Sequence, residues 1–250
     1  MAEKQKKGML KYLIHWSEER KLTILLAALI FDTVIVYPFV GMIGSNIAVQ
    51  VINSVIVSAI LLLGLVALTR RDITRMVLGA IVVIVISVHF VRLVLGAHWL
   101  MGWEISLSLV TVIIFAYLIL RCVYKEGRVT SHRIQAAVAA YLLIALAFAL
   151  GYHLTSFLIP GAITFPDNAA EISNPRFAFN FNYFSLVTIT TLGYGDIIPV
   201  NPFARTLAMT EALVGQLYPA TLLARLVSLY ILHSQKSHRT RQEDDAPADK

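Results

Sequence analysis

The residues of this sequence with the clearest chemistry lie in one short run, Thr191-Leu192-Gly193-Tyr194-Gly195-Asp196. Glycines alternate with larger residues here, and glycine adopts backbone angles that other L-residues avoid. Such a backbone turns successive carbonyl oxygens to one side, where they can replace the water shell of a cation. The Thr191 hydroxyl adds an oxygen at one mouth, and the Asp196 carboxylate favours cations at the other. The run therefore predicts a cation site built mainly from backbone oxygens.

The segment that contains this run is too short to cross a membrane twice as helices. We expect Phe177 to Pro199 to enter and leave on the same side. Such a re-entrant segment is tolerated at membrane depth only where protein buries it or where it lines a watery path. Its part from Phe179 to Thr190 is predicted to be a helix whose C-terminal carbonyls stabilise a cation. Alternate phenylalanines at its start are also typical of a strand.

The composition indicates an integral membrane protein. Of 250 residues, 58% are hydrophobic and only 14% are charged, too few polar residues to cover a soluble domain. Six apolar stretches approach the ~20 residues that cross a hydrocarbon core. We predict an all-α membrane protein with six transmembrane helices and the re-entrant helix and loop before the last one. The predicted spans are Leu22–Ile43, Ile47–Leu68, Met76–Leu95, Ile105–Val123, Ile134–Ile159 and Phe203–Leu232.

The net charge of +6 arises from basic residues that gather in alternate breaks between the spans. Excess Lys and Arg mark cytoplasmic loops. We therefore expect both termini in the cytoplasm and the re-entrant loop on the outside, with no nucleic acid as a partner. The predicted divisions are a cytoplasmic N-terminal tail (1–21), a four-helix transmembrane domain (22–123), a cytoplasmic linker (124–133), a helix–loop–helix domain (134–233) and a disordered cytoplasmic tail (234–250).

The stretch from Tyr183 to Asp196 resembles the pore loop of the potassium channel superfamily, and the similarity extends through Pro199 into the last span. It covers about the final third of the chain. The resemblance implies that Thr191 to Tyr194 supply potassium-coordinating carbonyls in a selectivity filter that includes Gly195. It also implies a subunit of a potassium-selective channel in the cell membrane. Such a channel is not an enzyme, passes ions passively and needs no cofactor besides the permeating potassium.

Three residues are expected to support the filter: Thr188, Tyr183 and Asp196. Val187 stands where some bacterial members of the superfamily place a glutamate that binds the aspartate behind the filter. Asp196 therefore needs another partner. Tyr183 offers a hydroxyl where relatives use a tryptophan, and we expect it to bind Asp196.

Gly215 and Pro219 weaken the same turn of the last span. Gly215 lies 20 positions after Gly195, where the superfamily commonly keeps a hinge glycine. Pro219 has no amide hydrogen, so the Gly215 carbonyl loses its helical partner. The pair predicts a gating hinge, and the alternative is a helix that is kinked only for packing.

Charged residues within the spans need partners, because an uncompensated charge at membrane depth is costly. Asp32 lies in the first span and Arg92 in the third, one turn from His89. We expect Asp32 and Arg92 to pair, either as a static contact or as an element that responds to protons or voltage. Glu211, one turn before Gly215, either hydrogen-bonds behind the filter or faces a neighbouring helix.

The fourth span argues against steep voltage gating. Ile105 to Leu120 contains no Lys or Arg, whereas each charge that crosses the field supplies ~2.3 kcal/mol per 100 mV. One filter segment per chain implies a homotetramer around one axis, surrounded by membrane lipids. The alternatives are a non-selective cation channel of the same architecture, and an active transporter or membrane enzyme. The latter would need an ATP-binding loop or a catalytic cluster, and the sequence offers neither.

Overall fold

The computed structural model of the chain describes residues 21–36, 38–39, 47–68, 72–96, 99–124, 131–165 and 175–244. Nearly all of them are helical. Residues 21–31 form a helix that continues into the π-helix η1 (Asp32–Val36). The remaining elements are α3 (Ile47–Leu68), α4 (Asp72–Leu95), α5 (Leu100–Val123), α6 (Ser131–Leu158), β1 (Ile163–Thr164), α7 (Pro175–Ile189), β2 (Ile198–Pro199) and α8 (Pro202–Asp244).

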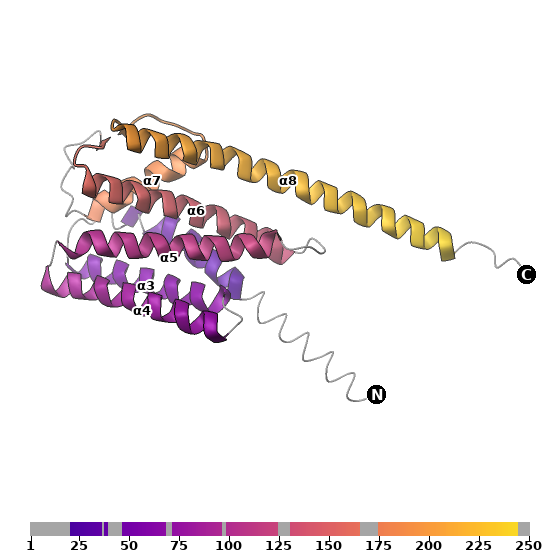
Figure 1. Cartoon of the computed structure of the whole chain (residues 1–250), viewed down its shortest axis with the longest axis horizontal. Coiled ribbons are helices and arrows are strands. Elements are labelled where there is room, and N and C mark those ends of the chain that lie inside the picture. The colour runs from indigo at the N-terminus through magenta and orange to yellow at the C-terminus, as the bar shows by residue number, and fades with distance from the viewer. Residues whose placement is uncertain are drawn as a thin grey trace, which may run out of the picture.

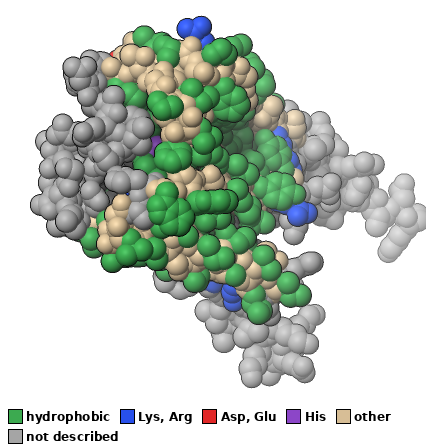
Figure 2. Space-filling view, turned by 60° about the vertical axis from the view of Figure 1, so that its left-hand side comes forward, with side chains coloured by type: hydrophobic (Ala, Val, Ile, Leu, Met, Phe, Trp, Pro, Cys, Tyr) green, Lys and Arg blue, Asp and Glu red, His purple; other side chains and the backbone are tan. Residues whose placement is uncertain are grey.

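Three of the described helices are long and apolar enough to cross a membrane. They are Ile73–Leu95, Leu100–Val123 and Arg133–Leu158, with mean hydropathies of 2.6, 2.3 and 2.1. They correspond to the third, fourth and fifth predicted spans. Large apolar side chains such as Ile73, Met76 and Val94 are more than 70% exposed, and apolar atoms cover much of the face in Figure 2. Such a surface suits contact with lipid.

The helices begin and end close to their predicted bounds, with informative exceptions. The bounds of α3 are those predicted, and helix rather than strand is confirmed for α7. The part of the first span beyond residue 39 lies outside the described residues. α5 begins at Leu100, five residues before the predicted start, and therefore includes Glu104.

The prediction of a disordered tail from residue 234 is wrong as far as Asp244. α8 continues to that residue as one helix. The segment from Gln235 to Asp244 contains Gln, Lys, Arg and Glu, which favour helix, and no glycine or proline interrupts it. Polarity alone therefore does not stop the helix. Residues 245–250 lie outside the described part of the chain.

The helices form a bundle in which α6 stands between two groups (Figure 1). α3, α4 and α5 lie side by side on one side of α6, and α7 and α8 lie on the other. Small buried residues on α6, among them Ala136, Ala139 and Ala140, share one core with Val112 and Ile119 of α5. Small side chains let the two backbones approach closely, so the two groups are packed through α6.

The segment between α6 and α8 is anchored at both ends. β1 and β2 pair antiparallel, with Ile163 opposite Pro199 and Thr164 opposite Ile198. The amides of Val200 and Asn201 both donate to the Ala162 carbonyl. Asn201 then caps α8, because its Oδ1 accepts from the Phe203 amide at 2.8 Å. These bonds fix where the predicted filter run, Thr191 to Asp196, reaches α8.

Candidate functional site

The run Thr191 to Asp196 folds back onto the last turn of α7. The Leu192 and Gly193 amides both donate to the Val187 carbonyl, at 2.9 and 3.3 Å. The Thr191 amide donates to the Thr188 carbonyl at 2.9 Å. The first half of the run is therefore fixed to the helix that precedes it, as a rigid coordination site requires.

The backbone of the run alternates in handedness. Thr191, Gly193 and Gly195 have φ of +59°, +59° and +78°, and the residues between them do not adopt positive φ. Glycine tolerates this region, but a threonine in it is strained by about 1–3 kcal/mol. Of the described residues, Thr191 alone combines a side chain with a positive φ. Strain of this kind is typical of functional sites, where the surroundings hold it in place.

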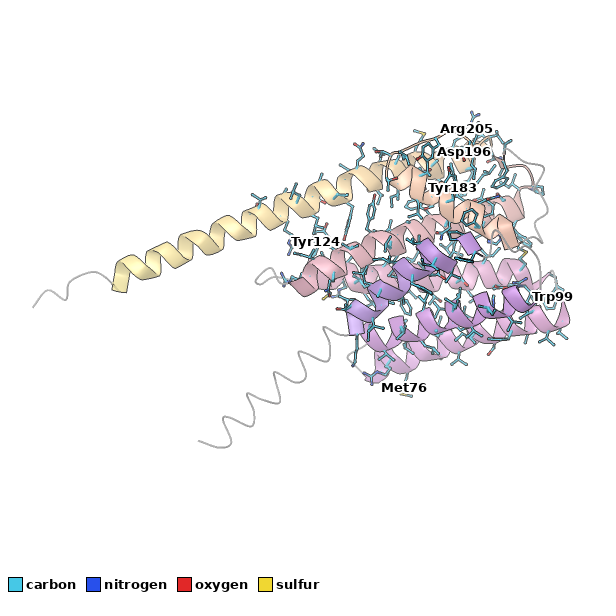
Figure 3. All side chains as sticks on the ribbon, turned by 180° about the vertical axis from the view of Figure 1, so that it is seen from behind. Met76, Trp99, Tyr124, Tyr183, Asp196 and Arg205 are labelled. Atoms are coloured by element: carbon cyan, nitrogen blue, oxygen red, sulfur yellow. The ribbon has the colours of Figure 1, made fainter. Side chains whose placement is uncertain are left out.

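Tyr183 and Asp196 are brought together at one end of the bundle (Figure 3). The Tyr183 hydroxyl donates to Asp196 Oδ2 at 2.8 Å. This is the contact that the sequence predicts for an aspartate without a glutamate partner at position 187. The Thr188 hydroxyl donates to the Phe184 carbonyl one turn back at 2.7 Å. Its hydroxyl is therefore used within α7, and Thr188 reaches the filter run through its carbonyl.

The side chains of the run have little cover from their own chain. Leu192 and Tyr194 are 56% and 67% exposed. Apolar residues of α8 are exposed as well: Phe203, Met209, Leu213 and Leu217 are each at least 60% exposed. Exposed apolar surface of this kind marks a site of contact with protein or with membrane.

Gly215 lies directly against the end of α7. A Cβ added there would be 2.8 Å from the Ile189 carbonyl carbon, 3.0 Å from its Cα and nearer still to its carbonyl oxygen. The Tyr141 hydroxyl donates to the same oxygen at 2.9 Å. α8 runs without a break through Gly215 and Pro219. Close packing therefore gives a reason for glycine at this position that does not depend on bending.

Glu211 lies behind α7, one turn from Gly215. It is 0% exposed. The Tyr152 hydroxyl of α6 donates to its Oε2 at 2.5 Å, and Ser185 of α7 hydrogen-bonds with its Oε1. These hydrogen bonds join Glu211 to α7, which precedes the run Thr191 to Asp196, and to the neighbouring helix α6, and neither bond reaches that run.

The expected pair of Asp32 and Arg92 is wrong. Arg92 Nε contacts Glu104 Oε2, and His89 Nδ1 contacts Glu104 Oε1. Glu104 lies in the second turn of α5 and contacts both α4 side chains. Glu104 lay outside the predicted span, which began one residue after it. A carboxylate at the start of one apolar helix, after an arginine near the end of the preceding one, was the available signal.

Asp32 is buried without an ion pair in the described part of the chain. It begins η1 and is 7% exposed. Its Oδ1 has no hydrogen-bond partner among the described residues. π-helical turns inside helices occur frequently at functional sites. The structure therefore separates Asp32 from the cluster of His89, Arg92 and Glu104.

At the opposite end of the bundle, α8 is joined to the end of α5 (Figure 3). Arg225 Nη2 donates to the Tyr124 carbonyl at 2.6 Å, and its guanidinium lies over the Tyr124 ring, 4.9 Å from the centroid. α5 and α8 thus meet far from Asp196. A movement of α8 at this end would disturb the end of α5.

Comparison with known proteins matches residues 107–231 to a family described as "Ion channel". Protein LctB from Bacillus caldotenax is 30% identical over 105 residues, which are 42% of this chain and 78% of that protein. Two pore potassium channel b from Oryza sativa subsp. japonica is 31% identical over 90 residues. Inward rectifier potassium channel Kirbac3.1 from Paramagnetospirillum magnetotacticum is 36% identical over 66 residues.

The matches to the two potassium channels are partial. They cover 35% and 26% of this chain, and the chain spans only 26% and 22% of the length of those relatives. The family match begins in α5 and ends in α8, so it includes α7 and the run Thr191 to Asp196.

Proposed function

Because the chain belongs to the ion channel family, within the potassium channel superfamily, we propose that it is a membrane channel subunit selective for potassium. Dehydrated potassium ions pass passively between backbone carbonyls of Thr191, Leu192, Gly193 and Tyr194. The ion is the transported species, and no further cofactor takes part.

One observation carries this proposal. Positive φ recurs at Thr191, Gly193 and Gly195, in a run whose first amides are bound to the end of α7. Carbonyl dipoles bind a cation firmly enough to replace its water and weakly enough to release it. Asp196, held by Tyr183, adds a negative charge at the outer mouth.

Four copies of the chain surround the conduction axis in this proposal. A single chain has one filter run, and a ring of oxygens needs several chains. The exposed Leu192, Tyr194 and Leu213 side chains are apolar surface for the neighbouring copies to cover. The outward apolar residues of α4, such as Met76 and Val83, face lipid in the cell membrane.

The proposal extends to topology and gating. Residues 22–123 form a four-helix domain beside the pore domain 134–233, and both termini are cytoplasmic. α5 has no charged residue between Glu104 and Arg121, so it carries no charge through the membrane field. The channel is therefore not steeply gated by voltage through this helix.

A pair of glycine variants tests the filter. Gly193→Ala and Gly161→Ala place a side chain at φ of +59° and +79°, and neither added Cβ meets another atom within 4 Å. Both changes therefore carry a similar backbone cost, but only Gly193 lies in the filter run. We expect potassium flux into vesicles to be lost in Gly193→Ala and retained in Gly161→Ala.

Reversal potentials of the reconstituted chain distinguish the alternatives. A potassium channel follows the potassium gradient without added energy. Equal passage of sodium and potassium would establish a non-selective cation channel instead. Flux that requires ATP or a coupled gradient would establish a transporter.

A further inference from the structure

Three helices meet at the Glu211 carboxyl group. Glu211 comes from α8, Tyr152 from α6 and Ser185 from α7, and all three side chains are 0% exposed. No Lys, Arg or His in the described part of the chain forms an ion pair with Glu211. The titratable groups that act on it are Tyr152 and Tyr141, both on α6.

The contacts of Ser185 determine where hydrogens must lie. Its Oγ is 2.6 Å from the Ala145 carbonyl oxygen and also contacts Glu211 Oε1. A hydroxyl has one hydrogen, and a carbonyl can only accept. If Ser185 donated its hydrogen to an ionised Glu211, Ser185 Oγ and the Ala145 carbonyl oxygen would face each other at 2.6 Å with no hydrogen between them. If Ser185 donates to Ala145, the hydrogen of the second contact comes from Glu211.

We infer that Glu211 is a neutral carboxylic acid that positions α7 against α6 and α8. The Tyr152 hydroxyl donates to Oε2, the Glu211 acid group donates from Oε1 to Ser185, and Ser185 donates to the Ala145 carbonyl. Every hydrogen in this series of hydrogen bonds then has an acceptor, and no unpaired charge is buried. Glu211 therefore acts as a positioning residue, and it adds no negative charge to the conduction path.

The junction of Glu211, Tyr152 and Ser185 lies where it can affect the proposed conduction. Ser185 lies one turn before Ile189, the last residue of α7, and two residues before Val187, whose carbonyl binds the filter amides. Gly215, one turn beyond Glu211, touches the Ile189 backbone. The hydrogen-bond chain thus fixes the helix that holds the filter run. This inference about conduction rests on the proposed function, whereas the protonation state does not.

Infrared spectroscopy of the full chain in lipid nanodiscs tests the protonation state without any measurement of flux. A neutral buried carboxylic acid has a carbonyl-stretch band that a carboxylate lacks. We expect this band in the parent protein and the loss of its Glu211 component in Glu211→Gln, whereas any component from the buried Asp32 should stay. Glu104→Gln is the matched control, because Glu104 is also little exposed but contacts Arg92 and His89. It should leave the band in place. A band that is absent in the parent, or unchanged in Glu211→Gln, would overturn the inference.

Flux measurements test the positioning role. Glutamine keeps one acceptor oxygen and carries an amide with two hydrogens in place of the single acid hydrogen, so we expect potassium flux in Glu211→Gln to remain near that of the parent. Glu211→Ala leaves the Tyr152 hydroxyl buried without an acceptor, and flux should fall at least about tenfold. If Glu211→Ala does not assemble, Ser185→Ala serves as the second variant. It keeps Glu211 and should cause a smaller loss of flux. Equal losses in the Gln and Ala variants would refute the positioning role, even if potassium selectivity in the parent is intact.

Discussion

The contact between Gly215 and the end of α7 makes a quantitative prediction about Gly215→Ala. The added Cβ would lie within 3.0 Å of two Ile189 backbone atoms and closer to the carbonyl oxygen. A backbone atom cannot rotate away as a side chain can, so α8 and α7 must separate. Overpacking of this kind costs about 1–3 kcal/mol.

Two further effects adjust this magnitude. Displacement of the Ile189 carbonyl weakens the hydrogen bond from Tyr141, which adds about 1 kcal/mol. Alanine is a better helix former than glycine by about 1 kcal/mol, which offsets that loss. We therefore expect Gly215→Ala to reduce the free energy of unfolding by about 1–3 kcal/mol.

Gly79→Ala is the matched control. Gly79 is also helical, but the nearest atom to a Cβ there would be Leu65 Cδ2 at 3.6 Å, which is an ordinary contact distance. It should gain up to about 1 kcal/mol from helix propensity. Denaturant unfolding in detergent micelles, followed by circular dichroism, measures both changes. If Gly215→Ala is as stable as Gly79→Ala, the tight contact is refuted. If that stable variant also opens less than the parent, flexibility becomes the reason for glycine.

Three other perturbations have defined outcomes. Tyr183→Phe removes the hydrogen-bond donor to Asp196. We expect roughly tenfold faster inactivation in single-channel recordings, because a bond to a charged acceptor contributes about 1.5 kcal/mol. An unchanged inactivation rate would contradict this support role. Pro219→Ala restores an amide donor for the Gly215 carbonyl, so open probability should fall if α8 bends there. Arg92→Gln should lower the free energy of unfolding by roughly 2 kcal/mol, and Glu104→Gln in the same chain should recover part of it.

The sequence predicted most strongly those features that depend on local pattern. The bounds of α3 follow from an apolar run between polar breaks, and the filter run follows from alternating glycines. Tyr183 was predicted to bind Asp196 because Val187 has no polar group to offer. Each of these depends on residues close together in the chain.

Features that depend on distant contacts were less predictable. β1 and β2 pair across 33 intervening residues. Each strand has two residues, which is too short for any periodicity to reveal. The contact between Arg92 and Glu104 was not predicted, because α5 begins before its apolar run and the predicted span therefore left Glu104 out. The contact of Gly215 with Ile189 depends on the angle at which α8 crosses α7, which no local pattern records.

The unbroken length of α8 makes it a lever. Its 43 residues span about 64 Å at 1.5 Å per residue, roughly twice the thickness of a hydrocarbon core. From the junction at Glu211 to Asp244 the rod is about 50 Å long. A tilt of about 5° at that fulcrum would swing the far tip by about 4 Å. A sub-ångström adjustment beside the filter and a displacement of several ångströms at the far tip are thus two ends of the same rigid motion.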